Sequence, residues 1–173
     1  MYPKEYIQFL VHFNGTRDYF ECHEILEEYW KESNDYQKDS IWVGLILLSV
    51  SRYHHRRENF SGAQRTLKKA INILSMHANR ITALGLDVQV LIPSLSHLLK
   101  NVENMEGYQS INLPVIEPIL LQACMERCES LGCTWGKGSN LEDKSIVHRH
   151  KLRDRTVVIE ERMKALRNRK GNE

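Results

Sequence analysis

The sequence has little of what marks a secreted, fibrous or membrane-spanning protein. Its 173 residues include only 4 Pro, 9 Gly and 4 Cys, which excludes a fibrous chain and a disulfide scaffold. The longest predominantly apolar run, Ile41 to Val50, has ten residues, whereas a membrane-spanning helix needs about 20. The segment Met1 to Glu5 has neither the apolar core of a signal peptide nor the composition of a transit peptide. We therefore expect a soluble cytoplasmic protein with reduced thiols and no membrane partner.

Helical periodicity dominates the chain. Hydrophobic residues make up 42% of it, which is enough for a buried core, and they recur at spacings of three and four. Between about residues 40 and 58 they point in nearly every direction round the helix axis, so this helix must be surrounded. The sequence predicts an all-α fold, a single helical bundle in which the central apolar helix is covered by other helices.

Two parts of the chain differ in pattern. Residues 1–106 have the spacing of a helical core domain. Residues 107–173 have two stretches where helical spacing fails and end in a predicted basic helix. We expect the second part to be a C-terminal extension packed on the same domain, with one domain overall.

Turn and cap residues predict several helix boundaries. Asn14-Gly15 predicts that the first helix ends in a turn, and Thr16 is a candidate N-cap for the next one. The stretch 61–64 has the pattern of a capping box for a fourth helix, which we expect to reach about Leu84. Pro93 should kink or restart the fifth helix.

The strongest candidate for chemistry is a histidine among glutamates in the predicted helix 17–32. His23 and Glu27 lie four residues apart and share one side of the helix, while Glu24 lies about 100° round the axis. His54, near the end of the central helix, is the natural third ligand. This set can hold zinc or another transition metal with open coordination positions, and a metal-dependent hydrolase would be its enzymatic form. It can equally act without metal, with a carboxylate orienting a histidine base.

The same helix also fits a purely structural role. A glutamate-rich helix beside arginines on a packed neighbour most simply forms salt bridges that fix the register of the two helices. The members that we expect in such a supporting polar network are Glu28, Arg52, Arg56, Arg57 and Asn59. In that case the protein is a non-catalytic interaction module, and we expect a homodimer.

Three cysteines near the C-terminus form a second candidate site. Cys124, Cys128 and Cys133, with His148 and His150, are zinc ligands in kind, but their spacing is not that of a zinc knuckle. Small buried thiols that pack in the core explain the cysteines more simply.

The C-terminal segment is basic. From Ser145 onward there are nine Lys/Arg and four Asp/Glu, although the whole chain has a net charge of only +2. Arg155, Arg162 and Arg169 repeat every seven residues, which predicts a cationic face on the terminal helix. We expect this face to contact the acidic helix 17–32, in the same chain or across a dimer. An anion or nucleic acid is the other candidate partner, but no helix-turn-helix spacing or aromatic-basic platform supports nucleic acid.

The order of these residues resembles a known family. The chain has aromatic-Glu-x-His-Glu-x-x-Glu-x-x-Trp at 20–30, Tyr-His at 53–54 and Asn-x-x-Gly-Ala at 59–63. This set, within about residues 12–75, resembles the domain-of-unknown-function family 309 of bacteria and archaea. The resemblance implies an all-helical fold with a surrounded central helix, and it brings no activity, substrate or cofactor. The family's recurring polar positions fall on His23, Glu24, Glu27, His54 and Asn59.

Three functions stay open on this sequence. The leading one is a binding protein whose polar His/Glu site, between the helix 17–32 and the end of the central helix, takes a ligand or a divalent metal. The alternatives are a homodimeric interaction module and a protein that binds an anion or nucleic acid through its basic C-terminal segment.

Overall fold

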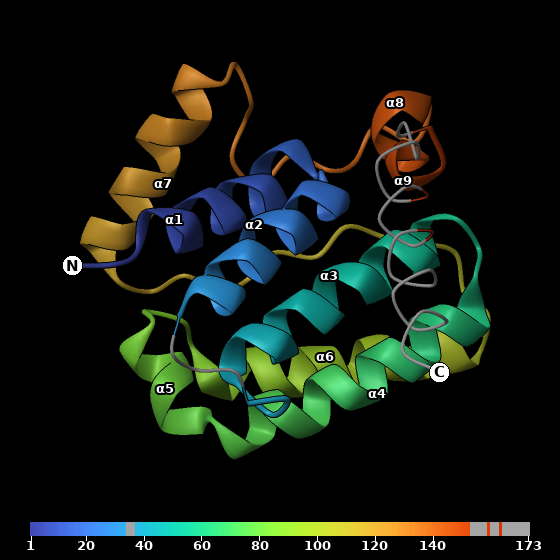
Figure 1. Ribbon diagram of the computed structural model, residues 1–173, viewed down its shortest axis with the longest axis horizontal. Coiled ribbons are helices and arrows are strands. Elements are labelled where there is room, and N and C mark those ends of the chain that lie inside the picture. The colour runs from blue at the N-terminus through green and yellow to red at the C-terminus, as the bar shows by residue number, and fades with distance from the viewer. Residues whose placement is uncertain (34–36, 153–158, 160–162, 164–173) are drawn as a thin grey trace.

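The computed structural model describes residues 1–33, 37–152, 159 and 163, and the statements below concern these residues. In chain order the helices are α1 (Lys4–Val11), the π-helix η1 (His12–Thr16), α2 (Tyr19–Glu32), α3 (Ile41–Arg56), α4 (Phe60–Met76), α5 (Ala78–Ala83), α6 (Val88–Glu103), α7 (Pro118–Ser130), α8 (Lys144–Val147) and α9 (Arg149–Leu152) (Figure 1). An isolated antiparallel bridge joins Leu86 to Val115. The prediction of an all-α fold is confirmed. Over the same residues, no helix combines the length and the apolar character needed to cross a membrane.

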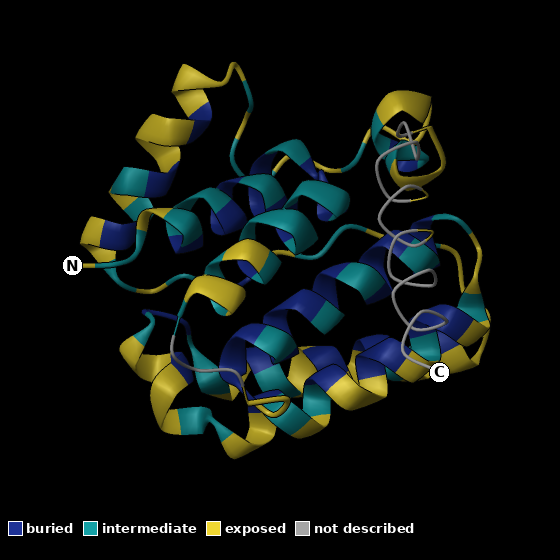
Figure 2. Cartoon of the chain, viewed as in Figure 1, coloured by how far each residue is buried: buried dark blue, intermediate teal, exposed yellow. Residues whose placement is uncertain are grey.

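Helix α3 is the centre of the bundle, as predicted. Ser40 caps it by accepting a hydrogen bond from Trp42 N, and α2 and α4 pack along it. Figure 2 shows it buried along most of its length. Its half-buried positions form a single stripe, because residues three and four apart share a helix face. The stripe consists of Val43, Leu47, Val50 and His54.

Gly44 allows α3 and α4 to approach closely. A Cβ at this position would lie 2.9 Å from Leu74 Cδ2 and 3.1 Å from Ile73 Cγ2, both on α4. Leu74 is fully buried and cannot easily move away. The missing side chain therefore sets the distance between the two helices.

The first helix does not end where its sequence predicts. Asn14 and Gly15 lie within η1, and Asp18 rather than Thr16 caps α2, accepting a hydrogen bond from Glu21 N at 3.1 Å. The reason is tertiary, because the Asn14 amide bonds both the N–H and the C=O of Leu113, at 2.8 and 3.0 Å. The polar side chain that predicts a local turn holds a distant segment instead.

Other boundaries also differ from those predicted. Asn59 caps α4 through Gly62 N, so the expected capping box at 61–64 is not formed. Helix α4 ends at Met76, and the short α5 follows it, in place of one helix to Leu84. Helix α6 runs through Pro93 without a break. Pro93 is exposed, so solvent can hydrate the carbonyl that its missing N–H leaves unpaired.

Buried arginines attach residues 107–147 to the helices. The Arg17 side chain is 2% exposed and the Arg56 side chain 6%, and Arg56 Nη1 donates to Arg17 O at 2.7 Å. Their acceptors in the extension include Ile111 O, Lys137 O and Ser139 Oγ, at 2.6, 2.8 and 3.0 Å. Arg52 is fully buried and bonds Gln109 O. These bonds pair most of the charged donors, which would be costly to bury unpaired, and of these three side chains leave only Arg52 Nε and Arg56 Nε without a partner in the described part of the chain.

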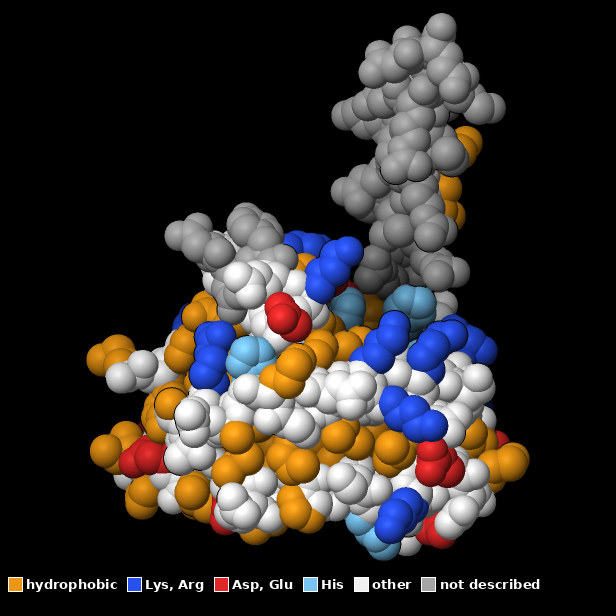
Figure 3. All heavy atoms as spheres, turned by 90° about the horizontal axis from the view of Figure 1, so that it is seen from below, with side chains coloured by type: hydrophobic (Ala, Val, Ile, Leu, Met, Phe, Trp, Pro, Cys, Tyr) orange, Lys and Arg blue, Asp and Glu red, His pale blue; other side chains and the backbone are white. Residues whose placement is uncertain are grey.

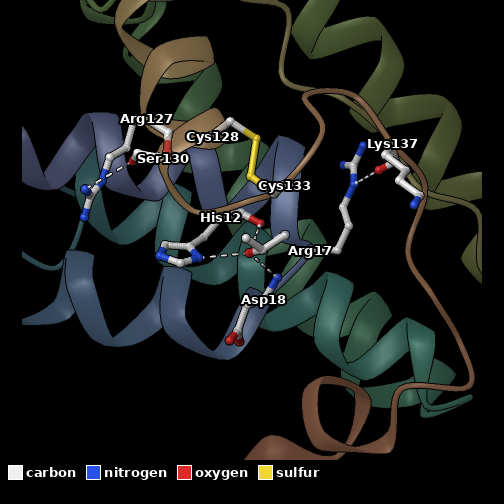
Figure 4. Close-up of a disulfide and its surroundings, with 9 residues drawn as sticks. His12, Arg17, Asp18, Arg127, Cys128, Ser130, Cys133 and Lys137 are labelled. Carbon is white, nitrogen blue, oxygen red and sulfur yellow. Dashed lines mark hydrogen bonds between the residues drawn. A yellow bond between two sulfur atoms is a disulfide. The ribbon is translucent and has the colours of Figure 1, made fainter.

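A disulfide closes the end of α7 and corrects the expectation of reduced thiols. Cys128 is bonded to Cys133, while Cys22 and Cys124 are buried free thiols. The two bonded sulfurs lie close against η1. A Cβ at Gly15 would be 2.7 and 2.9 Å from them. Figure 4 shows the disulfide above the turn that carries His12 and Arg17. The disulfide therefore packs directly against η1 at Gly15.

Substituting Gly44→Ala should destabilise the protein. Alanine gains about 1 kcal/mol in helix propensity, but overpacking a fixed core costs about 1–3 kcal/mol, and Leu74 has no room to move. We expect a net loss of about 1 kcal/mol in urea denaturation. Gly107→Ala is the control, because a Cβ there meets nothing within 4 Å. Equal or higher stability of Gly44→Ala would show that α3 and α4 can separate freely.

The thiol count tests the disulfide. Unfolded protein purified without reductant should react with a thiol reagent at two cysteines, Cys22 and Cys124, and at four after reduction. Because the cross-link restricts the unfolded chain, reduction should lower the free energy of unfolding by about 2 kcal/mol for so short a loop. Four reactive thiols before reduction would contradict the cross-link.

Candidate functional site

A pocket of about 520 Å³ lies where α2, the end of α3 and α9 meet. All four predicted ligand candidates line it, and the half-buried stripe of α3 leads into it through Val50. The lining residues are Tyr19, Phe20, His23, Glu24, Glu27, Lys31, Val50, Tyr53, His54, Arg57 and His150. The volume falls within the range of small-molecule sites, roughly 300–1,000 Å³.

One wall of the pocket carries His23 between two carboxylates. Its Nδ1 lies 2.9 Å from Glu24 Oε1, and its Nε2 lies 3.5 Å from Glu27 Oε2. One ligand atom from each of the three residues falls within 4.8 Å of the others. The other Glu27 oxygen, Oε1, pairs with Lys31 Nζ at 3.0 Å. All three members of the cluster are half-buried.

The contact with Glu24 assigns the proton of neutral His23. A carboxylate only accepts hydrogen bonds, so Nδ1 must carry the proton and Nε2 must present a lone pair. That lone pair then faces Glu27 Oε2, which is also an acceptor. Two acceptors 3.5 Å apart repel each other unless a proton or a cation lies between them.

His54 lines the same pocket but is not part of this three-residue group. Asn59 Oδ1 accepts from Gly62 N at 3.0 Å, so Asn59 Nδ2 must be the group that donates to His54 Nδ1, at 3.1 Å. Burial lowers the pKa of His54, and the charges of Arg57 and Arg65 lower it further. His54 is therefore a neutral imidazole with its proton on Nε2. In this state it is a hydrogen-bond donor and not the third metal ligand that the sequence predicts.

The arginines do not form the predicted salt-bridge network with the glutamates. Arg52 lies over the Tyr108 ring and Arg56 over the Tyr19 ring, at 4.6 and 4.7 Å, and both donate to the extension as described above. Arg57 does line the pocket. Among the described contacts of the α2 glutamates, Glu24 and Glu27 lie against His23, Glu27 pairs with Lys31, and Glu21 pairs with Arg149.

Glu28, another member of the predicted network, lies elsewhere. It is exposed and lines a separate, smaller pocket of about 250 Å³ with Glu5 and Glu32. Asn59 caps α4 and orients His54, so it supports the pocket without entering a salt bridge.

Residues outside the predicted His/Glu site complete the pocket. The Phe20 ring stacks near His23 and meets His150 edge-on, with ring centroids 6.3 and 5.6 Å apart. Arg149 pairs with Asp18 and, at 3.1 Å, with Glu21, which holds α9 beside the start of α2. A basic residue of the C-terminal part thus contacts the acidic helix. The predicted contact residues Arg155, Arg162 and Arg169 lie outside the described residues.

The cysteine-histidine set does not form a zinc site. Cys128 and Cys133 are bonded to each other, and Cys124 is buried in the core. His148 Nδ1 accepts from Arg57 Nε at 3.2 Å, and His150 lines the pocket. The cysteines are explained by packing and by one cross-link.

His55, next in sequence to His54, points into the interior. It is 1% exposed, accepts from Arg52 Nη1 at 2.9 Å through Nδ1, and donates from Nε2 to Glu106 O at 2.8 Å. Burial lowers the pKa of His55, and the charge of Arg52 acts in the same direction. The folded protein therefore holds His55 as a neutral imidazole.

Comparison with other proteins places the pocket in a family context. The family model DUF309, a domain of unknown function, matches residues 6–66. The chain is 45% identical over 170 residues, 98% of each chain, to the "Uncharacterized protein YpuF" of Bacillus subtilis (strain 168). The chain belongs to the DUF309 family. The matched segment runs from α1 into α4 and contains the His23 cluster, His54 and Asn59, so the DUF309 region supplies most of the pocket. No solved structure gives a significant match.

Acid should destabilise this DUF309 protein partly through His55. Because its pKa is lower when folded than the ordinary value of 6.5, the unfolded state takes up the proton first. The contribution of neutral His55 to the free energy of unfolding is therefore present above about pH 6.5 and is lost as the pH falls below that value. The free energy of unfolding between pH 7 and 5 should fall less steeply in His55→Gln, which can still accept from Arg52 and donate to Glu106. Exposed His97→Gln is the control, and an unchanged slope in His55→Gln would contradict the assignment.

Proposed function

We propose that this DUF309 protein binds a divalent transition-metal ion in the pocket, with His23 Nε2 and Glu27 as protein ligands. The observation that carries the proposal is the distance of 3.5 Å between His23 Nε2 and Glu27 Oε2, which are two facing acceptors when His23 is neutral. Two ligands at zinc distances of about 2.0–2.1 Å from one ion, at a tetrahedral angle, lie about 3.4 Å from each other. The pair therefore has the spacing of two ligands that share an ion.

Glu24 supports the proposal as an orienting group. Histidine ligands usually donate their other ring N–H to a carboxylate or carbonyl, which fixes the tautomer and raises the basicity of the ligating nitrogen. Glu24 Oε1, 2.9 Å from His23 Nδ1, occupies this position. The carboxylate thus prepares the nitrogen that would bind the ion.

The donor set limits which ions fit and what they could do. An imidazole with a carboxylate suits zinc, iron, cobalt or manganese more than calcium. Two protein ligands leave coordination positions for water or a small molecule, and an ion bound in this way supplies Lewis-acid chemistry. The positive charge of Lys31, which pairs with Glu27, partly neutralises that ligand. We therefore expect the protein to bind the metal ion more weakly than structural zinc sites do.

Calorimetric titration with Zn²⁺ tests the site. We expect one ion per chain, no detectable binding to His23→Ala or Glu27→Ala, and an affinity about 10- to 100-fold lower in Glu24→Gln, as for other orienting carboxylates. Glu28→Gln is the matched control, because Glu28 lies on the same helix outside the pocket and should leave the affinity unchanged.

The same variants separate binding from a structural role. If the wild-type protein takes up no Zn²⁺ while His23→Ala and Glu27→Ala lose about 1–3 kcal/mol of stability, the cluster is an ion-pair network that holds the fold. Binding that survives both alanine substitutions would place the ion elsewhere.

A further inference from the structure

We infer that the same pocket binds the phosphate group of a small molecule, through Arg57, the Tyr53 hydroxyl and His54. The inference rests on the proposed metal site, which would occupy the wall formed by α2. All three donors come from the last turn of α3 and its C-cap, and all three line the pocket. A phosphate presents several oxygens, which can meet the three donors and an ion together.

Arg57 has donor capacity to spare. Its Nε donates to His148 Nδ1 at 3.2 Å and its Nη1 to Tyr53 OH at 3.4 Å, both longer than the usual distance of about 2.9 Å. Its guanidinium lies 5.1 Å from the Tyr53 ring centre. Among the described residues no carboxylate pairs with it. A guanidinium has five N–H donors in a fork that matches phosphate.

The Tyr53 hydroxyl has an unused proton. It accepts from Arg57 Nη1 and from His150 N, the latter at 3.2 Å. A hydroxyl has two acceptor lone pairs and one donor, so two accepted bonds leave its O–H to find a further acceptor. The residue is 7% exposed and lines the pocket, where an oxyanion is such an acceptor.

His54 adds a third donor. As shown above, Asn59 holds Nδ1 as an acceptor, so the neutral ring carries its proton on Nε2. The positive charges of Arg57 and Arg65 disfavour a second proton. His54 therefore donates to an anion without needing to be charged.

The charge around the donors is positive. In Figure 3, Lys and Arg side chains gather toward the end of the molecule where α3 ends and α4 begins. The opposite wall carries Glu24 and Glu27, which repel an anion. A divalent ion at Glu27 would remove this repulsion, so ion and phosphate should each raise the affinity for the other.

Aromatic rings form the surface between the two walls. Phe20 packs against His150, and His150 against Tyr53, with centroids 5.6 and 6.3 Å apart. They offer a partly apolar contact for the organic part of a phosphorylated ligand. The geometry thus fits a small phosphate ester better than a bare ion.

Titration with inorganic phosphate tests the inference. The full chain, loaded with slightly less than one equivalent of Co²⁺, should bind phosphate with a change in the visible cobalt spectrum, and more tightly than the metal-free chain. Arg57→Gln should lower the phosphate affinity about 10- to 100-fold and Tyr53→Phe about 3- to 10-fold, the range for charged and neutral hydrogen bonds. Measured without phosphate, the cobalt affinity should not fall in either variant, because neither side chain is a proposed metal ligand. Arg65→Gln is the control, since Arg65 is exposed and does not line the pocket.

The outcomes distinguish this inference from the proposed function. If Co²⁺ binds but phosphate does not, or if Arg57→Gln and Arg65→Gln behave alike, the phosphate site is overturned and the metal site stands. If Co²⁺ does not bind, phosphate binding to the metal-free chain that depends on Arg57 supports the oxyanion site alone. No phosphate binding in that case overturns both.

Discussion

Guanidinium groups that are buried and must find acceptors control how this fold is assembled. Arg17 and Arg56 are almost fully enclosed, and their hydrogen bonds go to carbonyl and hydroxyl oxygens rather than to carboxylates, although Arg56 Nε has no partner among the described residues. Because a buried cation left unpaired costs several kcal/mol, residues 107–147 are held against α3 and η1. Arg56 also reaches Ile146 O, in α8. The position of α8 brings α9 to the start of α2, where Arg149 pairs with Asp18. One wall of the pocket therefore depends on these buried bonds.

The pocket combines two walls of opposite charge. Helix α2 contributes acceptors, of which His23 Nε2 and Glu27 Oε2 face each other. The end of α3 contributes donors, of which Arg57 and the Tyr53 hydroxyl have unused capacity. Such an arrangement is costly for the protein alone, because neither set satisfies the other across the pocket. A ligand that carries a cation and an anion would satisfy both.

Local geometry explains why part of the site could be predicted. His23 and Glu27 share a side of α2 because a helix places residues four apart on one face. His54 reaches the same pocket because it ends the half-buried stripe of α3 that begins at Val43. The tautomer of His54 could not be predicted, because Asn59 sets it while capping another helix. Arg52 and Arg56 are predicted to pair with the glutamates because their helices pack together, but both side chains donate to the extension.

By itself the sequence determined the all-helical fold, most of the longer helices and the central place of α3, because hydrophobic periodicity and an all-round apolar segment leave few other arrangements. It also determined the spacing within the His23 cluster, which one helix turn dictates. Only the tertiary structure decided how polar side chains with several possible partners were used. Asn14 bonds Leu113 instead of ending a helix, and Cys128 meets Cys133. The bonds of Asn14 join segments that are far apart in the chain. The local spacing of residues does not predict how close such segments come in the folded protein.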